Sequence, residues 1–458
     1  MTAVLLDSLA AIVGAANILS GDDVTSRNVD FFSDETCQGL AIVRPANTEE
    51  VAKVMALCHQ HQQKVVTIAG QTGMVKGGRA AADELFVSLE RMNRIVELDP
   101  QSRTLTVEAG VTMQAVQEAA EAAGFFYPVD LGARGSATIG GNIATNAGGN
   151  RVIRFGMTRD QVLGLEVVLA DGTVMSNLGK LLKNNTGYDL KQLFVGSEGT
   201  LGIVTKAVLR LRPAVKQSHV AMLAVSEFAS LPGILQRVDE ELEGGLCAFE
   251  VMWQEFFDCI AEAYPDKTLP LPPGSAFYVL VEQLSGDDGE RLQQVLMALY
   301  EDGLIEDIAL AQSDRQRQAI WEIRDDVETI SEQLGGVGIG YDVSLPIAEM
   351  DDYINTLKAN LAEADSASRC VAFGHMGDSN LHLAIAYKDN SESDKLEIDH
   401  LVYGPLKNIQ GSVSAEHGIG LTKKAYLPLC RSDAEIGLMR GIKQVFDPLN
   451  IMNPGKIF

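Results

Sequence analysis

The chain has 458 residues, 46% of them hydrophobic, which is enough for two or three domains with separate cores and argues against intrinsic disorder. The 62 acidic residues outnumber the 37 basic ones, so the formal net charge is −25. Nucleic-acid binding is excluded on this ground, because contact with a phosphate backbone needs clustered lysine and arginine. Such a charge is typical of a well-solvated surface, and it could also attract a basic protein partner.

The N-terminal apolar run over residues 10–19 lacks a basic flank and is too short to span a bilayer. The apolar residues from Leu5 to Val13, which overlap this run, recur at helical spacing and predict an amphipathic helix. Six scattered cysteines show no CxxC spacing and are typical of free thiols in a reducing compartment. We therefore expect no transmembrane segment and a cytoplasmic location.

A helical segment, residues 1–37, is predicted to come first. A strand over 39–45 then leads into a helix that Asn47 or Thr48 caps, and Glu49 and Glu50 complement the dipole of its first turn. The remaining elements predicted in this half are strands at 64–69, 85–89 and 104–108, a helix at 113–123, a hairpin at 162–175 and a strand ending at Pro213.

Three glycine-rich segments interrupt these elements, at 70–78, 131–149 and 196–205. In the first, four glycines in nine residues let backbone N–H groups converge on an anion, although the spacing fits neither a Walker A loop nor GxGxxG. The second is a run of nineteen mainly small residues, too long for a routine connection, so we expect it to contact a ligand. Three such loops in one α+β region indicate a large, elongated ligand that contains a pyrophosphate.

From about residue 216 the pattern indicates a second α+β domain, predicted as an antiparallel sheet with helices on one face. Its expected strands are 220–225, 277–282, 338–343, 371–373 and 381–385, and its expected helices are 229–243, 287–302, 347–364 and 394–409. A last helix is predicted at 432–446, before Pro448.

Two short stretches, 374–382 and 414–420, hold three of the seven histidines. His375, His382 and Glu416 provide two imidazoles and a carboxylate, a common ligand set for a catalytic divalent metal. His417 lies beside the carboxylate and could move a proton. The alternative is that these are ordinary residues of glycine-rich turns, since histidine pairs arise by chance. The adjacent Glu-His pair and the flanking glycines favour the metal.

Together these segments resemble flavin-dependent 2-hydroxy acid dehydrogenases of the vanillyl-alcohol oxidase/PCMH-type FAD superfamily, most closely the D-2-hydroxyglutarate and D-lactate dehydrogenases. The resemblance extends from Arg44-Pro45 to Asn453-Pro454-Gly455, and its most specific signature is KNNTGYDLKQLFVGSEGTLG at 183–202. It implies an α+β fold with a PCMH-type FAD-binding domain (38–215) and an α+β substrate- and metal-binding cap domain with an antiparallel sheet (216–420). A C-terminal helical segment (421–458) would return to the FAD.

The resemblance also implies the cofactors. FAD would be held without a covalent bond, because residues 64–90 contain no histidine. The metal on His375, His382 and Glu416 would be zinc, with manganese or iron as alternatives. The residues expected to contact FAD are Gly70, Gln71, Thr72, Gly73, Met74, Gly77, Ser136, Thr138, Gly141, Ala144, Asn146, Ala147, Glu198, Gly199, Gly202, Ile203 and Asn453.

The implied reaction oxidises a D-2-hydroxy acid to the 2-oxo acid by hydride transfer to flavin N5, with His417 as the general base and the metal lowering the pKa of the hydroxyl. Arg324 would bind the substrate carboxylate through its planar fork. Its alternative is a helix-surface ion pair with Asp325, Asp326 or Glu328. The expected partners are the substrate and an electron-acceptor protein or quinone, and a homodimer is compatible with the sequence.

Three positions depart from the pattern of close 2-hydroxyglutarate enzymes, which have a lysine, a hydroxyl residue and an asparagine where this chain has Gly340, Glu328 and Ala384. Loss of the lysine removes a charge-assisted hydrogen bond to a distal carboxylate, worth about 1.5–3 kcal/mol. The departures therefore favour a smaller or differently shaped acid such as D-lactate. Other readings are the flavin subunit of a glycolate oxidase-type complex, a flavin-binding protein without dehydrogenase activity, and a flavin-free metal hydrolase.

Overall fold

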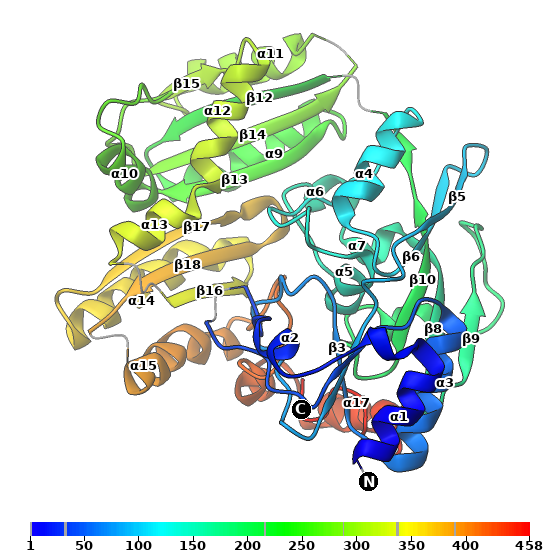
Figure 1. Ribbon diagram of the computed structural model, residues 1–458. Helices are drawn as coiled ribbons and strands as arrows, with labels where there is room; N and C mark the ends of the chain where they lie inside the picture. Colours follow the sequence, from blue (N-terminus) through cyan, green and yellow to red (C-terminus); the bar gives the residue numbers. More distant parts are fainter. Residues whose placement is uncertain (1, 32–33, 215–216, 287, 336–338, 389–390) are drawn as a thin grey trace. The chain divides into compact units, whose positions relative to one another are not determined.

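The structure is a computed structural model that describes residues 2–31, 34–214, 217–286, 288–335, 339–388 and 391–458. The chain divides into two compact units. The first unit contains residues 1–149, 156–214 and 416–458, and the second contains 150–155 and 215–415. Neither unit is therefore a continuous piece of chain. Figure 1 colours the chain from its N-terminus to its C-terminus.

A small sheet of four strands carries the first glycine-rich loop of the first unit. The strand order is β1-β2-β4-β3, and β2 and β3 both pair in parallel with β4. The strands are β1 (Ile18–Leu19), β2 (Ile42–Val43), β3 (Val65–Ile68) and β4 (Leu85–Ser88), and the helices α1 (Thr2–Val13) and α3 (Thr48–His61) contact one another in the same unit. The predicted cap of α3 is confirmed, because the Asn47 side chain accepts the N–H of Glu50.

The second sheet of this unit has five antiparallel strands in the order β5-β6-β10-β8-β9. They are β5 (Ile95–Asp99), β6 (Thr104–Glu108), β8 (Val162–Val168), β9 (Val174–Asn177) and β10 (Ile203–Arg210), and α4 (Met113–Ala122) adds apolar residues to the same core. The small-residue run 131–149 is not a loop throughout, since α5 (Ile139–Thr145) forms within it. The Thr138 hydroxyl caps α5 by accepting the N–H of Gly141, which explains how a glycine-rich sequence begins a helix here.

The second unit is built on seven antiparallel strands in the order β15-β12-β14-β13-β17-β18-β16. They are β12 (Gln217–Val225), β13 (Leu246–Trp253), β14 (Phe277–Ser285), β15 (Asp307–Leu310), β16 (Ile339–Ser344), β17 (Arg369–His375) and β18 (Asn380–Ala386). The expected antiparallel sheet is thus confirmed. Residue 338, the first of the predicted strand 338–343, and residue 287, the first of the predicted helix 287–302, lie outside the described part of the chain.

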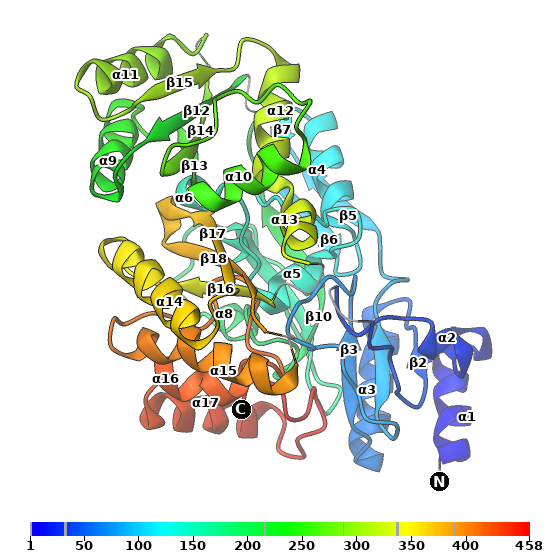
Figure 2. The same ribbon diagram turned by 90° about the vertical axis from the view of Figure 1, so that its left-hand side faces the viewer.

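Helices cover both faces of this sheet, so the expectation of helices on one face was wrong. Figure 2 shows α10 (Gln254–Ala263), α12 (Asp314–Asp325) and α13 (Val327–Gln333) on one side, with α9 (Leu231–Glu241) and α11 (Glu290–Glu301) on the other. The physical reason is visible in β13, which is buried at every position and therefore needs cover on both faces. Apart from Glu250 this strand is a run of hydrophobic residues, which explains why no alternating pattern predicted it.

A six-residue excursion of the chain, residues 150–155, belongs to the second unit and contains α6 (Val152–Phe155). Arg151 forms an ion pair of 3.3 Å with the buried carboxylate of Glu282 on β14. Arg154 donates to the carbonyl oxygen of Leu284 over 2.7 Å. These contacts fasten the excursion to the end of the sheet.

The six cysteines form no disulfide bonds among the described residues, as the sequence predicts. Within the described ranges, no helix is both long and apolar enough to cross a membrane.

The C-terminal tail is tied to the first unit by a buried ion pair. In α17 (Asp433–Phe446), the ammonium group of Lys443 donates to the carbonyl oxygens of Thr200 and Met452 and to the carboxylate of Asp447. Asp447 is 1% exposed and also accepts the N–H groups at the start of the tail. Met452 of the tail then pairs with Val65, the first residue of β3, the strand that precedes the first glycine-rich loop.

Replacing Lys443 with methionine should therefore destabilise the protein. The substitution leaves the Asp447 carboxylate buried without its cation, a loss of about 3–5 kcal/mol. Thermal and urea denaturation of this variant and of a control variant measure the change in the free energy of unfolding. Lys53→Met is the matched control, since its pair with Glu49 is exposed and should contribute only about 0.3–0.5 kcal/mol. Equal stability of the two variants would contradict the role given to Lys443.

Candidate active site

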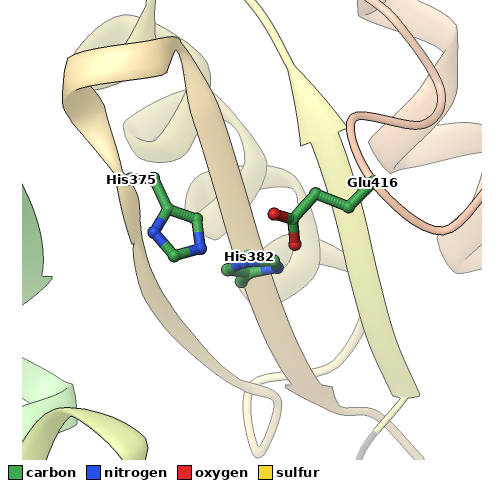
Figure 3. Close-up of side chains that lie close together, drawn as sticks. All are labelled: His375, His382 and Glu416. Carbon is green, nitrogen blue, oxygen red and sulfur yellow. The ribbon is translucent and has the colours of Figure 1, made fainter. Parts of the chain in front are cut away.

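Three predicted metal ligands lie together in the structure. One ligand atom from each of His375, His382 and Glu416 lies within 4.8 Å of the other two. Figure 3 shows the two imidazole rings and the carboxylate directed toward one another. The ring centroids of the histidines are 5.3 Å apart, and the rings are nearly perpendicular. Two imidazoles and a carboxylate are a donor set that suits a divalent transition metal.

A tight hairpin supplies both histidines. His375 is the last residue of β17, a short 3₁₀ turn (Met376–Asp378) follows, and His382 is the third residue of β18. Gly374 is required where the two strands meet, because a Cβ atom there would lie 2.4 Å from the carbonyl oxygen of Asn380. The sequence Gly-His-Met-Gly-Asp therefore fixes the spacing of the ligands through the geometry of the turn.

A buried carboxylate on the neighbouring strand orients the first ligand. The Nδ1 atom of His375 lies 2.7 Å from the carboxylate of Glu250, which leaves Nε2 on the side of His382 and Glu416. Burial alone would raise the pKa of Glu250, but the charges of His375 and Arg324 outweigh it and hold that pKa below its usual value. A carboxylate on the outer nitrogen of a ligand histidine is the usual second partner in metal sites.

Arg324 lies inside this cluster and not on a helix surface. It is 4% exposed, and its Nε donates to the carboxylate of Glu250 over 2.8 Å. The alternative of a surface ion pair with its acidic neighbours on the helix is therefore wrong. Its Nη2 atom lies 3.4 Å from Nε2 of His375, beside the three candidate ligands. The guanidinium group is thus held by one edge next to the candidate ligand His375.

The stretch that carries Glu416 and His417 begins where the chain passes from the second unit to the first. Just before it, the amide N–H of Ala415 donates to the buried carboxylate of Asp342 on β16 over 3.1 Å. Just after it, the carboxylate of Glu198 accepts the N–H groups of Ile419 and Gly420, both over 2.7 Å. Backbone contacts of this kind fix the path of the chain on each side of Glu416 and His417.

The glycine-rich loops of the first unit pack against one another by their backbones. A Cβ atom on Gly70 would lie 1.9 Å from the carbonyl oxygen of Ser136, so the first two loops are in direct contact. Gly73 and Gly77 have no atom of the described residues within 4 Å of an added Cβ, which leaves space beside the first loop. The hydroxyl of Thr67 is buried in this region and has no hydrogen-bond partner among the described residues. Such a cradle fits a large ligand that approaches the backbone.

The third loop and the C-terminal tail join the same arrangement. Asn453 accepts the N–H of Thr67 through its amide oxygen over 2.9 Å and donates to the carbonyl oxygen of Glu198 over 2.5 Å. The N–H of Glu198 donates to the carbonyl oxygen of Ala144 over 2.7 Å. Asn453, expected to return to the cofactor, thus lies between the first and third loops.

The other residues expected to contact a cofactor fall into groups. Ser136, Thr138, Gly141, Ala144, Asn146 and Ala147 line α5 or its ends, whereas Gln71, Thr72 and Met74 lie in the first loop. Gly199 packs against Asn453. Gly202 is enclosed by Val167 and Phe194, and Ile203 is buried at the start of β10.

Sequence reasoning missed Glu250 and Asp342. Each is the single acidic residue of its strand, and each is buried. A buried charge requires partners that compensate its lost hydration. An isolated acidic residue in an apolar strand could therefore have marked both positions before the structure was known.

Two positions that depart from the 2-hydroxyglutarate pattern lie opposite each other. Gly340 on β16 pairs with Ala384 on β18, one pair away from Tyr341 and two away from the Asp342–His382 pair. An added Cβ on Gly340 would have no atom of the described residues within 4 Å. The sheet beside His382 therefore carries two small side chains and open space.

Comparison with known proteins places this geometry in a family. Residues 215–457 match the family described as FAD linked oxidases, C-terminal domain, and residues 39–176 match the FAD binding domain family. A probable mitochondrial D-2-hydroxyglutarate dehydrogenase of Oryza sativa subsp. japonica is 37% identical over 98% of this chain and 80% of its own length. The D-2-hydroxyglutarate dehydrogenase of Xanthomonas citri pv. viticola is 40% identical over 92% of this chain and 89% of its own. A putative mitochondrial D-lactate dehydrogenase of Schizosaccharomyces pombe is 36% identical over 95% and 84%.

Solved structures give the same fold at low sequence identity. An alkyldihydroxyacetonephosphate synthase superposes with a TM-score of 0.77 at 16% identity, over 99% of this chain and 86% of the other. The 4-ethylphenol oxidase from Gulosibacter chungangensis has a TM-score of 0.76 at 16% identity, over 99% and 96%. The fold class expected from the sequence is thus confirmed. The chain belongs to the FAD-linked oxidases and, among them, to the family of the D-2-hydroxyglutarate dehydrogenases, and it is an FAD-dependent oxidoreductase.

Proposed function

We propose that the chain oxidises a D-2-hydroxy acid to the corresponding 2-oxo acid, with FAD as the electron acceptor and a divalent metal in the site. The observation that carries the proposal is the convergence of His375, His382 and Glu416 in a member of an FAD-linked oxidase family. The names of the relatives, D-2-hydroxyglutarate and D-lactate dehydrogenases, support the substrate class.

The donor set supports the metal. When bound, a divalent ion supplies a Lewis acid that lowers the pKa of the substrate hydroxyl. We propose zinc, with manganese or iron as alternatives that the same ligands accept. His375 offers Nε2 because Glu250 occupies the region of its Nδ1. The protein therefore presents one fixed nitrogen and a carboxylate from another segment.

The three packed glycine loops and the tail support non-covalent FAD. When bound, FAD supplies an acceptor for a hydride from the substrate α-carbon. Residues 64–90 around the first loop contain no histidine that could form a covalent link. The open side of Gly73 and Gly77 and the buried hydroxyl of Thr67 are the features of this chain that suit a close-lying cofactor.

Arg324 and His417 complete the proposed chemistry. Arg324 uses Nε for Glu250, and its Nη2 lies beside Nε2 of the candidate ligand His375, where we propose that the guanidinium group donates to a substrate carboxylate. Its burial strengthens such a bond relative to the same bond in water. His417 adjoins the ligand Glu416 in sequence, and we propose that it accepts the hydroxyl proton.

The Gly340–Ala384 pair supports an acid without a distal carboxylate, such as D-lactate. Neither residue offers a charge or a hydrogen bond from its side chain, and the pair lies beside His382. The electron acceptor beyond FAD is proposed to be a protein or a quinone. The cytoplasmic location stays a prediction, since several relatives named mitochondrial come from eukaryotes.

Removal of the metal should abolish turnover without removing the flavin. We expect dialysis against a strong chelator, or the substitution His375→Ala, to eliminate substrate oxidation while the visible FAD spectrum is retained. Added zinc should restore the chelated wild-type protein and not the variant. Full turnover after verified removal of metal would contradict the metal mechanism and leave the family assignment intact.

Gly340→Lys should shift the substrate preference. A lysine in the open space can donate a charge-assisted hydrogen bond to a distal carboxylate, worth about 1.5–3 kcal/mol, or about 10–100-fold in kcat/KM. Anaerobic stopped-flow reduction with D-2-hydroxyglutarate, D-lactate and their L-enantiomers measures the change. Ala384→Asn tests the opposite strand independently. A wild-type preference for D-2-hydroxyglutarate over D-lactate would refute the proposed substrate.

His417→Ala should slow flavin reduction by about 10²–10⁴-fold, because the substrate hydroxyl loses its general base. The rate of bleaching of the oxidised flavin under anaerobic conditions is the measurement. His400→Ala is the control, since His400 is exposed on the helix α15 (Glu392–Tyr403). An unaltered rate in the His417 variant would assign the base to another residue.

A further inference from the structure

The short segment that carries Glu416 and His417 is held at each end by a different carboxylate, and the two carboxylates belong to different units. The inference drawn from this arrangement rests on the proposed function, because it concerns how a metal ligand and a base are positioned. Neither carboxylate lies among the three candidate ligands.

The first end is fixed by Asp342 in the second unit. This residue is 0% exposed, and one of its oxygens accepts the N–H of Ala415 over 3.1 Å and the hydroxyl of Ser414 over 3.2 Å. Ala415 directly precedes Glu416, so the hydrogen bond restricts the backbone immediately before the ligand. A buried carboxylate with several donors is strongly held, because each lost donor would leave charge unsolvated.

Asp342 also reaches the strand of the second histidine. Its other oxygen accepts the side-chain N–H of Asn380 over 2.7 Å, and Asn380 donates as well to the carbonyl oxygen of Val343 over 3.2 Å. Asp342 is the cross-strand partner of His382 in the β16–β18 register. One carboxylate therefore sets the relative positions of two of the three ligand-bearing segments.

The second end is fixed by Glu198 in the first unit. Each of its two oxygens accepts one backbone N–H, from Ile419 and from Gly420, over 2.7 Å. The segment approaches closely here: a Cβ on Gly418, whose φ is +84°, would lie 2.9 Å from the Glu198 carboxylate. Gly420, with φ +49°, lies against the backbone of Val75, where an added Cβ would be 2.1 Å from the carbonyl oxygen.

The side chain of Glu198 is thus engaged by the segment that follows His417. Burial raises the pKa of Glu198 above its usual value, whereas the N–H groups of Ile419 and Gly420 act to lower it. The backbone of Glu198 meets α5 through Ala144 and the tail through Asn453. Glu198 is also among the residues expected to contact FAD, and its contacts link the cofactor loops to the segment of the base.

We propose that Asp342 and Glu198 are positioning residues with separate effects: Asp342 sets the metal ligand Glu416, and Glu198 sets the base His417. Loss of the first should weaken metal binding. Loss of the second should slow proton removal while metal and flavin stay bound. The separation follows from the position of each hydrogen bond, one residue before Glu416 and two to three residues after His417.

The experiment compares Asp342→Asn and Glu198→Gln in the full-length holoprotein. Asn and Gln keep the shape of the side chain and lose the charge and one acceptor oxygen. Each has a matched control at a buried carboxylate elsewhere in its own unit. Asp399→Asn removes the charge from the acceptor of the Tyr341 hydroxyl, and Glu166→Gln alters the contacts of Thr48 and Lys206.

Zinc affinity, measured by competition with a chromophoric chelator, should fall about 10–100-fold in Asp342→Asn. The FAD spectrum should stay unchanged, and the rate of flavin reduction should recover at high zinc. In Glu198→Gln, zinc affinity and FAD content should equal those of the wild type. Its rate of flavin reduction should fall about 100-fold and not recover with zinc, as expected for a displaced catalytic group. Both controls should match the wild type in all three measurements.

Two milder variants keep the test decisive if the first pair folds poorly. Ser414→Ala removes one donor from Asp342 and should weaken zinc binding about 2–10-fold. Gly418→Ala places a methyl group against the Glu198 carboxylate and should slow flavin reduction without loss of zinc.

Each contrary result overturns a different part of the proposal. Wild-type zinc affinity in Asp342→Asn overturns the first anchor, and loss of FAD from Glu198→Gln shows a cofactor-binding role and overturns the second. A wild-type protein that binds neither zinc nor another divalent ion overturns the metal centre of the proposed function itself.

Discussion

The site depends on a buried carboxylate, Glu250, that is shared by Arg324 and His375. A carboxylate that is 1% exposed can remain charged only if its partners replace the lost water, and here a guanidinium and an imidazole do so. The same contacts orient both partners. Because one oxygen holds the ring of His375 and the other holds one edge of Arg324, the sheet presents a candidate metal ligand and a cation side by side. Glu250 on β13 is therefore needed both to satisfy its buried partners and to orient them toward the site.

Much of the fold was predictable where local signals agree with burial. The cap at Asn47, the hairpin with its Asp171-Gly172 turn and the helix before Pro448 all follow from short-range chemistry. The failures have a common physical cause. Fully buried β13 has no alternating pattern, and α5 forms from small residues because Thr138 caps it and close backbone packing supports it. Tertiary contacts, which the sequence pattern does not record, decide both elements.

The candidate site divides in the same way. The donor residues His375, His382 and Glu416 were predictable, since their chemistry is unusual in this chain and a sharp turn separates the histidines. Their supports were not, because Glu250 and Asp342 come from strands distant in sequence and act through burial. Arg324 shows the intermediate case: its residue type suggested an anion partner, whereas its true neighbour in the structure, Glu250, lies 74 positions away.

The excursion of residues 150–155 has a consequence for how this protein can be divided. A fragment cut at the obvious boundary near residue 215 would contain the whole seven-stranded sheet but lack Arg151 and Arg154. Glu282 would then be buried without its arginine, and the carbonyl oxygen of Leu284 would lose its donor. Each of the two family matches covers one continuous range of sequence, 39–176 and 215–457. Each folded unit, in contrast, is made of separate ranges. A second unit that keeps these contacts when it is produced alone must therefore include residues 150–155, which interrupt the sequence of the first unit.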